Sequence, residues 1–307
     1  ILSGLVGSEM CIRDSARTFT VKHQPNITGV ANITITINDG TNQSTYTFMV
    51  TVVPSPSYYW NILAGQGSGG AGSVDGIGTA ASFNAPESLA LDGSGNLFVG
   101  DFAGYKVRKI DLATAQVTTI AGNGSRGTVN NANPLLSSFG YIKGVAVDSA
   151  GNVYVLESAV LNSTLTIRKI AYNSGTSTYG PVTTLYDGGA ASLNVGTGLL
   201  VARDGSGLYF TSSTDLRKFT FSNSQVTLLA NVAGQLSYDL NGDILVSNVF
   251  NVYRVTAQGQ VSNPPGFTFR SDFATVPGYS SLVQLANGFY VRSYDFNQLE
   301  IVGLGDN

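Results

Sequence analysis

Four short groups of residues offer oxygen atoms that could hold a cation, since each places an aspartate close to glycine. The groups lie at 92–96, 148–152, 204–207 and 239–243. A calcium loop needs about six to eight converging oxygen ligands, usually including a bidentate carboxylate. Each group supplies only a small part of such a set. Each also lies between runs of alternating apolar residues, where aspartate and glycine suit a tight turn. We therefore interpret the groups as hairpin turns.

Histidine and cysteine, which carry much nucleophilic and transition-metal chemistry, are nearly absent. The chain has one histidine, His23, and one cysteine, Cys11, so no internal disulfide can form. Ser-His-Asp and Cys-His catalysis need a histidine base, and zinc or copper sites use histidine or cysteine ligands. The remaining enzymatic route is a metal held by carboxylates, but Glu87 is the only acid among the expected first-strand positions and Lys143 opposes it. We expect no catalytic residue, no bound metal and no cofactor.

Arginine-lysine pairs recur at 108–109, 168–169 and 217–218, and Arg254 takes the same place once more. Neighbouring side chains on a strand point to opposite faces, so each pair sends one cation to each side of its sheet. We expect the arginine to bond an acid at the end of the preceding strand, such as Asp101 or Glu157. This structural role is favoured over a basic ring that binds a ligand.

Aromatic residues gather in the loops of a repeated four-strand unit, and they are the candidate binding residues. Those in or beside the loops between second and third strands, or leading into a first strand, are Phe102, Tyr105, Tyr141, Phe250, Tyr294 and Phe296. If these loops emerge on one face, their rings form an exposed patch that could stack on a sugar or grip a peptide, and the insertions at 123–139 and 158–164 would rim it. Packing between neighbouring units is the alternative for each ring.

The unit that positions these residues recurs from residue 58 onward. Its copies lie at 88–122, 144–186, 199–230, 235–262 and 281–303. Each has an apolar strand ending in a turn, a second strand rich in Val, Tyr or Phe, an Arg-Lys strand and a Val-Thr strand; the fifth copy lacks the last. A constant strand pattern with variable loop lengths predicts β-propeller blades.

The stretch 62–110 resembles the bacterial NHL repeat. Its glycine-rich approach, the Asn-x-Pro step, the hairpin ALDGSGNLFVGD and the RKI strand occur in that order. The resemblance implies a β-propeller of four-stranded blades. The segment YYWNILAG at 58–65 is similar to the fourth strand of the first unit, so we expect it to complete the last blade. We predict five blades; six would require a degenerate strand within 263–280 or more chain beyond Asn307.

A different β fragment precedes the repeats at 16–53. Ile33, Ile35 and Ile37 alternate with polar residues, Asn38-Asp39-Gly40 indicates a turn, and a second alternating run follows. This hairpin resembles the last strands of bacterial immunoglobulin-like or cadherin-like domains, so 16–53 is predicted to be part of such a domain. Residues 54–57 form a proline-containing linker, and the propeller spans 58–307. Residues 1–15 resemble a translated adapter sequence and are set apart as a non-native lead-in; a genuine lead-in is the alternative.

The charge and apolar content of the chain limit the classes of partner that it is expected to bind. Charged residues make up 11% of the chain and the net charge is −3, which disfavours nucleic-acid binding. No apolar run approaches the roughly 20 residues of a membrane helix, and 1–15 lacks the features of a signal peptide. We expect a monomeric module of a longer, extracellular or cell-surface bacterial chain that binds a protein or carbohydrate at the propeller face. The alternatives are a metal-dependent lactonase or lyase of the propeller type, and a structural spacer in a long surface protein.

Overall fold

The computed structural model describes residues 29–38, 43–52, 62–66, 71–158, 164–188, 195–239, 241–248, 251–262, 282–284, 290–294 and 298–302. The chain divides into two compact units, Ile1–Asn61 and Ile62–Asn307. Within the described ranges, no helix has both the length and the apolar character needed to cross a membrane.

The first unit contains one antiparallel hairpin of β1 (Gly29–Asn38) and β2 (Gln43–Val52). Ile33 pairs with Phe48 and Ile35 with Tyr46. β-branched and aromatic residues on facing positions are the pairs that stabilise such strands. The predicted alternating strands are therefore formed. Part of the predicted turn, residues 39 and 40, lies outside the described residues, as does His23.

The second unit consists of successive antiparallel sheets, each built from consecutive strands. Blade 1 contains β4 (Pro86–Leu91), β5 (Asn96–Asp101), β6 (Lys106–Asp111) and β7 (Gln116–Ala121), with the short β3 (Gly76–Ile77) added beside β7. Blade 2 contains β8 (Tyr141–Val147), β9 (Val153–Ser158), β10 (Leu165–Asn173) and β11 (Thr178–Asp187). Blade 3 contains β12 (Val195–Val201), β13 (Gly207–Ser212), β14 (Leu216–Thr220) and β15 (Gln225–Ala230). Blade 4 contains β16 (Gln235–Tyr238), β17 (Ile244–Ser247), β18 (Val252–Val255) and β19 (Val261–Ser262).

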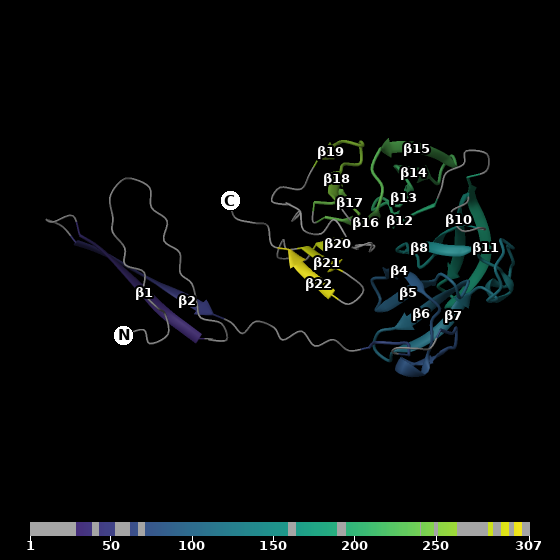
Figure 1. Ribbon diagram of the computed structural model, residues 1–307, viewed down its shortest axis with the longest axis horizontal. Coiled ribbons are helices and arrows are strands. Elements are labelled where there is room, and N and C mark those ends of the chain that lie inside the picture. The colour runs from purple at the N-terminus through teal and green to yellow at the C-terminus, as the bar shows by residue number, and fades with distance from the viewer. Residues whose placement is uncertain are drawn as a thin grey trace. The chain divides into compact units, whose positions relative to one another are not determined.

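The first strand of each blade lies innermost. β4 contacts β8, β8 contacts β12, and β12 contacts β16, although these strands belong to different sheets. Figure 1 shows β4, β8, β12 and β16 toward the middle of this unit, with β7, β11, β15 and β19 at its periphery. Sheets that meet through their inner strands fan around an axis, so the fold is a β-propeller of four-stranded blades, as predicted.

The blade count differs from the prediction, and the described part of the expected closing segment carries no strand. The described residues form four four-stranded blades rather than five or six, and the fifth unit is a three-stranded sheet of β20 (Leu282–Gln284), β21 (Tyr290–Tyr294) and β22 (Gln298–Val302). Residues 62–65, expected to close the last blade, carry no strand, because the Gly65 amide bonds to the Gly78 carbonyl beside blade 1 instead. Residues 58–61 and 263–280 lie outside the described residues.

Three of the hydrophobic clusters among the described residues lie between neighbouring blades. Phe98 of β5 and Val107 of β6 pack in one cluster with Ile142 of β8 and Val155 of β9. A second cluster joins blade 2 to blade 3, and a third joins blade 3 to blade 4. Each fully buried large side chain stabilises the fold by about 1.5–3 kcal/mol. The loops at the blade ends are therefore mounted on a rigid frame.

The aspartate-glycine groups are turns, as predicted. Asp92 Oδ1 accepts hydrogen bonds from the backbone amides of Ser94 and Asn96 at 2.8 and 2.9 Å. Asp148 repeats the pattern with the amides of residues 150 and 152 at 3.0 and 2.9 Å. These carboxylate oxygens hold the hairpins that join first and second strands.

Candidate functional site

One end of each blade carries the loops in which candidate binding residues were predicted. Because strands alternate in direction, the loop between the second and third strands lies at the same end as the segment leading into the first strand. In blade 1 the two are directly bonded: the Asn84 side-chain amide donates to the Ala103 carbonyl at 3.1 Å, and the Ala103 amide donates to the Asn84 carbonyl at 3.0 Å.

Three predicted aromatic residues come together at this end of blades 1 and 2. Phe102 stacks on Tyr141 with ring centroids 4.9 Å apart, and Tyr105 lies 5.6 Å from Tyr141. Phe102 and Tyr105 belong to the loop between β5 and β6, whereas Tyr141 begins β8 of the next blade. All three are partly exposed. We refer to these three side chains as the aromatic cluster.

Two cations border the aromatic cluster. The Lys143 ammonium lies 4.1 Å from the Phe102 ring centroid, and the Arg126 guanidinium lies 5.7 Å from that of Tyr141. A cation over a ring face is attracted to the ring quadrupole. Lys143 is also paired with Glu87 at 2.9 Å, and its side chain is only 10% exposed. Arg126 is exposed, and it is the cation of the two that a partner can reach.

The hydroxyl of Tyr141 has two polar neighbours, Arg126 and Tyr105. Arg126 Nη1 donates to it at 3.3 Å, and the Tyr105 hydroxyl is its second partner. Hydrogen bonds from Arg126 and Tyr105 lower the pKa of Tyr141, while burial and the bond to Tyr141 raise the pKa of Tyr105. The Tyr141 hydroxyl can therefore accept from Arg126 and still donate its own proton to a further acceptor.

The loop that carries Phe102 and Tyr105 is held by a buried ion pair. Arg108 and Asp101 have fully buried side chains, 3.5 Å apart. Asp101 Oδ1 also accepts the Asn84 amide at 2.7 Å, and Arg108 Nη1 donates to the Ser82 carbonyl at 3.0 Å. Tyr105 itself has a φ of 54°, which is uncommon for a residue other than glycine. The packed surroundings hold it in this conformation.

Blade 2 repeats the device. Arg168 donates to Glu157 at 2.8 Å and to the Ser138 carbonyl at 3.2 Å, and the Gly140 amide, next to Tyr141, donates to Glu157 at 2.7 Å. Burial raises the pKa of Glu157 despite the opposing effect of Arg168. The predicted arginine-acid pairs are thus confirmed for Asp101 and Glu157. The same end of each blade is tied to its sheet by an arginine whose charge is internally compensated.

The corresponding arginines of blades 3 and 4 pair with acids that do not end the second strand of their blade. Arg217 binds Asp215 at 2.7 Å, and Arg254 binds Asp239 at 2.8 Å. Asp215 precedes β14 by one residue, and Asp239 follows β16, where the sequence predicted only a turn. The sequence pattern therefore did not single out either residue as a partner of an arginine.

The other three predicted binding residues are not brought into this cluster by the described structure. Phe250 and Phe296 lie outside the described residues. Tyr294 ends β21, and its side chain lies outside the description. Conversely, the sequence analysis did not single out Arg126, although the insertion at 123–139 that carries it was expected to rim the face. Among the described residues, no group of three or more His, Cys, Asp or Glu side chains is arranged to hold a metal ion.

Comparisons with known proteins place the chain by fold. No family model matches it. A 62-residue stretch, 20% of this chain, is 40% identical to part of SUPPRESSOR OF QUENCHING 1, chloroplastic, of Arabidopsis thaliana, and covers 6% of that protein. A structural genomics protein of unknown function from Bacteroides thetaiotaomicron superposes with a TM-score of 0.53 and 17% identity, over 76% of this chain and 57% of that one. A chain from a nidogen/laminin complex gives a TM-score of 0.49 and 14% identity, over 71% of this chain and 76% of that one. The chain therefore spans a small part of the plant protein and a little over half of the Bacteroides chain, and the structural likeness concerns the fold alone.

Proposed function

We propose that this chain is a binding module that recognises a protein segment through the end of blades 1 and 2. The observation that carries the proposal is the convergence of Phe102, Tyr105 and Tyr141, from two blades, on one partly exposed cluster beside Arg126. Tyrosine and arginine are the residue types enriched where a few contacts dominate the binding energy of a protein interface. The rigid blades beneath reduce the entropy lost when a partner binds.

The polar groups of the cluster favour a partner that presents an acidic side chain or a backbone carbonyl. Arg126 supplies an exposed positive charge. The hydrogen bonds from Arg126 and Tyr105 lower the pKa of Tyr141, which strengthens its hydroxyl as a donor. Both groups donate, so a carboxylate beside an apolar residue would satisfy them while the rings cover the apolar part.

A protein partner is favoured over a glycan because the rings of Phe102 and Tyr141 already have a stacking partner and a cation against them. Phe102 stacks on Tyr141 and has the Lys143 ammonium 4.1 Å from its centroid. A sugar that stacks flat needs an uncovered ring face, whereas a peptide side chain can contact ring edges. The experiment must therefore distinguish peptide binding at the cluster from glycan binding.

The test screens a displayed random-peptide library and a glycan array against wild type, Tyr141→Phe, Arg126→Ala and the control Tyr172→Phe. Tyr172 is matched in residue type and lies on β10 next to the hairpin 173–178, at the other end of blade 2. We expect enriched peptides that contain an acid, and affinities that fall about tenfold or more in Tyr141→Phe and Arg126→Ala, because each loses a hydrogen bond involving a charged group. The control keeps wild-type affinity.

Two results would overturn the proposal. The first is a library that yields no peptide sensitive to either cluster variant. The second is glycan binding that both variants abolish in the absence of peptide binding, which would reassign the cluster to a sugar.

We further propose that the blades are NHL-type repeats, that β1 and β2 belong to an immunoglobulin-like domain, and that the chain acts outside the cell or at its surface. The repeated Arg-Lys strands support the repeat type, and the low content of charged residues, 11% of the chain, supports a location outside the cell or at its surface. Fractionation of the source organism, followed with an antibody to the propeller, tests it: recovery in the cytoplasm would contradict it.

A further inference from the structure

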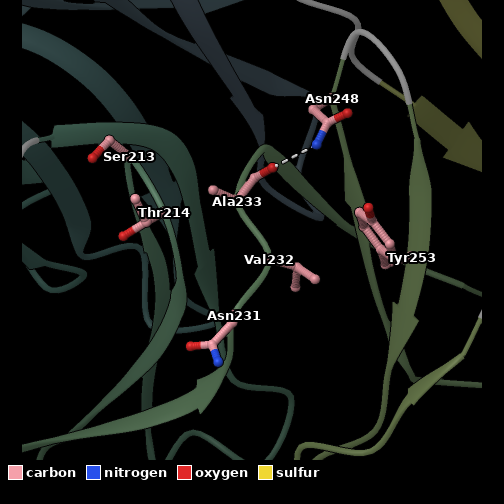
Figure 2. A pocket seen from close by; sticks show the side chains of 7 residues that line it. All are labelled: Ser213, Thr214, Asn231, Val232, Ala233, Asn248 and Tyr253. Carbon is pink, nitrogen blue, oxygen red and sulfur yellow. Dashed lines mark hydrogen bonds between the residues drawn. The ribbon is translucent and has the colours of Figure 1, made fainter.

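A recess lies between blades 3 and 4, at the end of the blades that carries the loops between second and third strands. It has a volume of about 390 Å³. Ser213 and Thr214 form one wall in the loop between β13 and β14, and Asn231 and Val232 line it from the segment between β15 and β16. Figure 2 shows Tyr253 of β18 on the far side, facing the chain at Val232. None of these residues belongs to the aromatic cluster.

None of the described residues that line this recess carries a carboxylate, ammonium or guanidinium group. Its polar groups are hydroxyls and side-chain amides, from Ser213, Thr214, Asn231 and Asn248, and its apolar groups are Val232, Ala233 and the ring of Tyr253. Such a set donates and accepts hydrogen bonds without preferring either sign of charge. A ligand that complements it is uncharged, has several hydroxyls, and has an apolar face to lie on an aromatic ring.

The nearby charges are compensated within the wall. Asp215 takes two bonds from Arg217, at 2.7 and 2.9 Å, and a third from the Ser212 hydroxyl at 2.7 Å. Burial would raise the pKa of Asp215, but the hydrogen bonds from Arg217, Ser212 and Thr214 lower it. The carboxylate therefore stays ionised, and its charge is balanced by that of Arg217, so the pair adds no net charge beside the recess.

The recess is formed before any ligand arrives. The Asn248 side-chain amide donates to the Ala233 carbonyl at 3.1 Å, the contact drawn in Figure 2, and its oxygen accepts the Asn251 amide at 2.9 Å. On the opposite wall, the Ser212 hydroxyl accepts the Thr214 amide at 3.1 Å. Walls fixed in this way lose little conformational freedom on binding.

Small side chains keep the recess open. Ser213 directly follows the second strand of blade 3, and Phe102 directly follows the second strand of blade 1. The aromatic ring that fills the end of blade 1 is thus replaced in blade 3 by a hydroxymethyl group. The volume of about 390 Å³ lies at the lower end of the range of about 300–1,000 Å³ for small-molecule sites, which suits one or two sugar rings.

We propose that this recess binds a neutral saccharide unit, with the Tyr253 ring as the stacking surface and Asn231, Ser213 and Thr214 as hydrogen-bonding groups. The inference rests on the lining and its geometry, and it stands independently of peptide binding at the aromatic cluster. The ligand class is a free neutral monosaccharide or the neutral terminal unit of a glycan; both present the same hydroxyl-bearing ring.

The experiment titrates isotope-labelled full chain with glucose, galactose, mannose and N-acetylglucosamine, and follows backbone and side-chain amide signals. Glucuronate and glucosamine serve as charged counterparts of the same ring. We expect saturable shifts, at millimolar concentrations of at least one neutral sugar, at Asn231, Asn248 and residues 213–214, and weaker shifts with the charged sugars. A methyl glycoside of the responding sugar would then distinguish the two sources: a site for a glycan terminus accepts a substituted anomeric oxygen and binds the glycoside as well as the free sugar, whereas a site for a free sugar binds the glycoside more weakly.

Two variants address the site without disturbing the core. Ser213→Trp fills the recess from an exposed position, and Asn231→Ala removes an exposed amide. Each should weaken binding of the responding sugar by about tenfold or more, while Asn223→Ala, an exposed asparagine in the turn after β14, should not. The inference is overturned if no neutral sugar shifts these signals, if the shifts lie elsewhere, if the charged sugars bind equally well, or if Ser213→Trp binds as wild type does.

Discussion

Replacing Asn130 by aspartate is expected to stabilise the propeller, because blade 2 lacks an acceptor that blade 1 has. In blade 1, Asp75 Oδ1 accepts from Arg108 Nε at 3.2 Å and from Nη2 at 2.7 Å. In blade 2, Arg168 takes the place of Arg108, but its Nε is buried and has no hydrogen-bond partner among the described residues. An unsatisfied buried donor on a charged group lowers stability.

Equivalent residues of blades 1 and 2 make equivalent contacts, and this correspondence places Asn130 of blade 2 where blade 1 has Asp75. Arg108 pairs across the sheet with Thr119, and Arg168 pairs with Thr184. Asp75 bonds the Thr119 hydroxyl at 2.9 Å, and the Asn130 side-chain amide bonds the Thr184 hydroxyl at 3.1 Å. A carboxylate at 130 would therefore keep the threonine contact and also reach Arg168 Nε.

The size of the effect follows from burial. A hydrogen bond to a charged group contributes about 1.5–3 kcal/mol. Asp75, the blade 1 counterpart of position 130, has a side chain that is 46% exposed. Solvent screens an ion pair with such exposure, so we expect Asn130→Asp to raise the free energy of unfolding by about 1 kcal/mol. For a domain of this size that is a rise in Tm of about 2–4 °C. The reciprocal change, Asp75→Asn, should lower Tm by at least as much.

The pH dependence supplies a second measure. Burial would raise the pKa of Asp75, but hydrogen bonds from Thr119 and Arg108 outweigh it and lower the pKa below its usual value. A carboxyl group with a lowered pKa in the folded state stabilises above its unfolded pKa of about 3.9 and loses that contribution as pH falls through the folded pKa. The stability difference between wild type and Asp75→Asn should therefore shrink below about pH 4.

Calorimetry and chemical denaturation at neutral pH measure both changes. Asn223→Asp is the control, because it adds the same charge at an exposed turn whose asparagine oxygen accepts only the Gln225 amide among its described contacts. If Asn130→Asp leaves Tm at the control value or lowers it, the assignment of Arg168 Nε as an unsatisfied donor is wrong. If Asp75→Asn is neutral, the blade 1 contact does not stabilise the fold.

The remaining predictions concern the ion pairs and the loop that carries the aromatic cluster. Glu157→Gln should lower the free energy of unfolding by about 3 kcal/mol or more, since it leaves the fully buried Arg168 without its counter-charge. Asp215→Asn should lower it by only about 1–2 kcal/mol, since Arg217 is partly exposed. Denaturant titration measures both losses, and equal losses would contradict the reasoning. Gly122→Ala should destabilise the propeller by about 1–3 kcal/mol, because φ at Gly122 is +97° and the new Cβ would collide with the Tyr105 carbonyl. The near-ultraviolet circular dichroism spectrum should change as well. An unchanged spectrum with wild-type stability would show that the loop adapts freely.

Local sequence patterns determined the strands and the turns. Alternating apolar residues require one face to be buried, and Asp92 and Asp148 need only atoms within their own turns, so both features could be predicted from neighbouring residues. The pairing of Arg108 with Asp101 and of Arg168 with Glu157 was predictable for the same reason, since adjacent strands of one hairpin bring these positions together.

Only the tertiary structure decided the number of blades and the composition of the sites. Residues 62–65 resemble a strand, yet Gly65 bonds to Gly78 instead of pairing with a distant sheet, an outcome that depends on competing long-range contacts. The insertion at 123–139 was expected to rim this face, but its local sequence does not indicate that Arg126 would be the residue that contacts Tyr141. The recess near Tyr253 exists because Ser213 and Ala233 are small and come from separate segments. A sequence states which residues are adjacent along the chain, whereas a site depends on which segments the packed blades bring side by side.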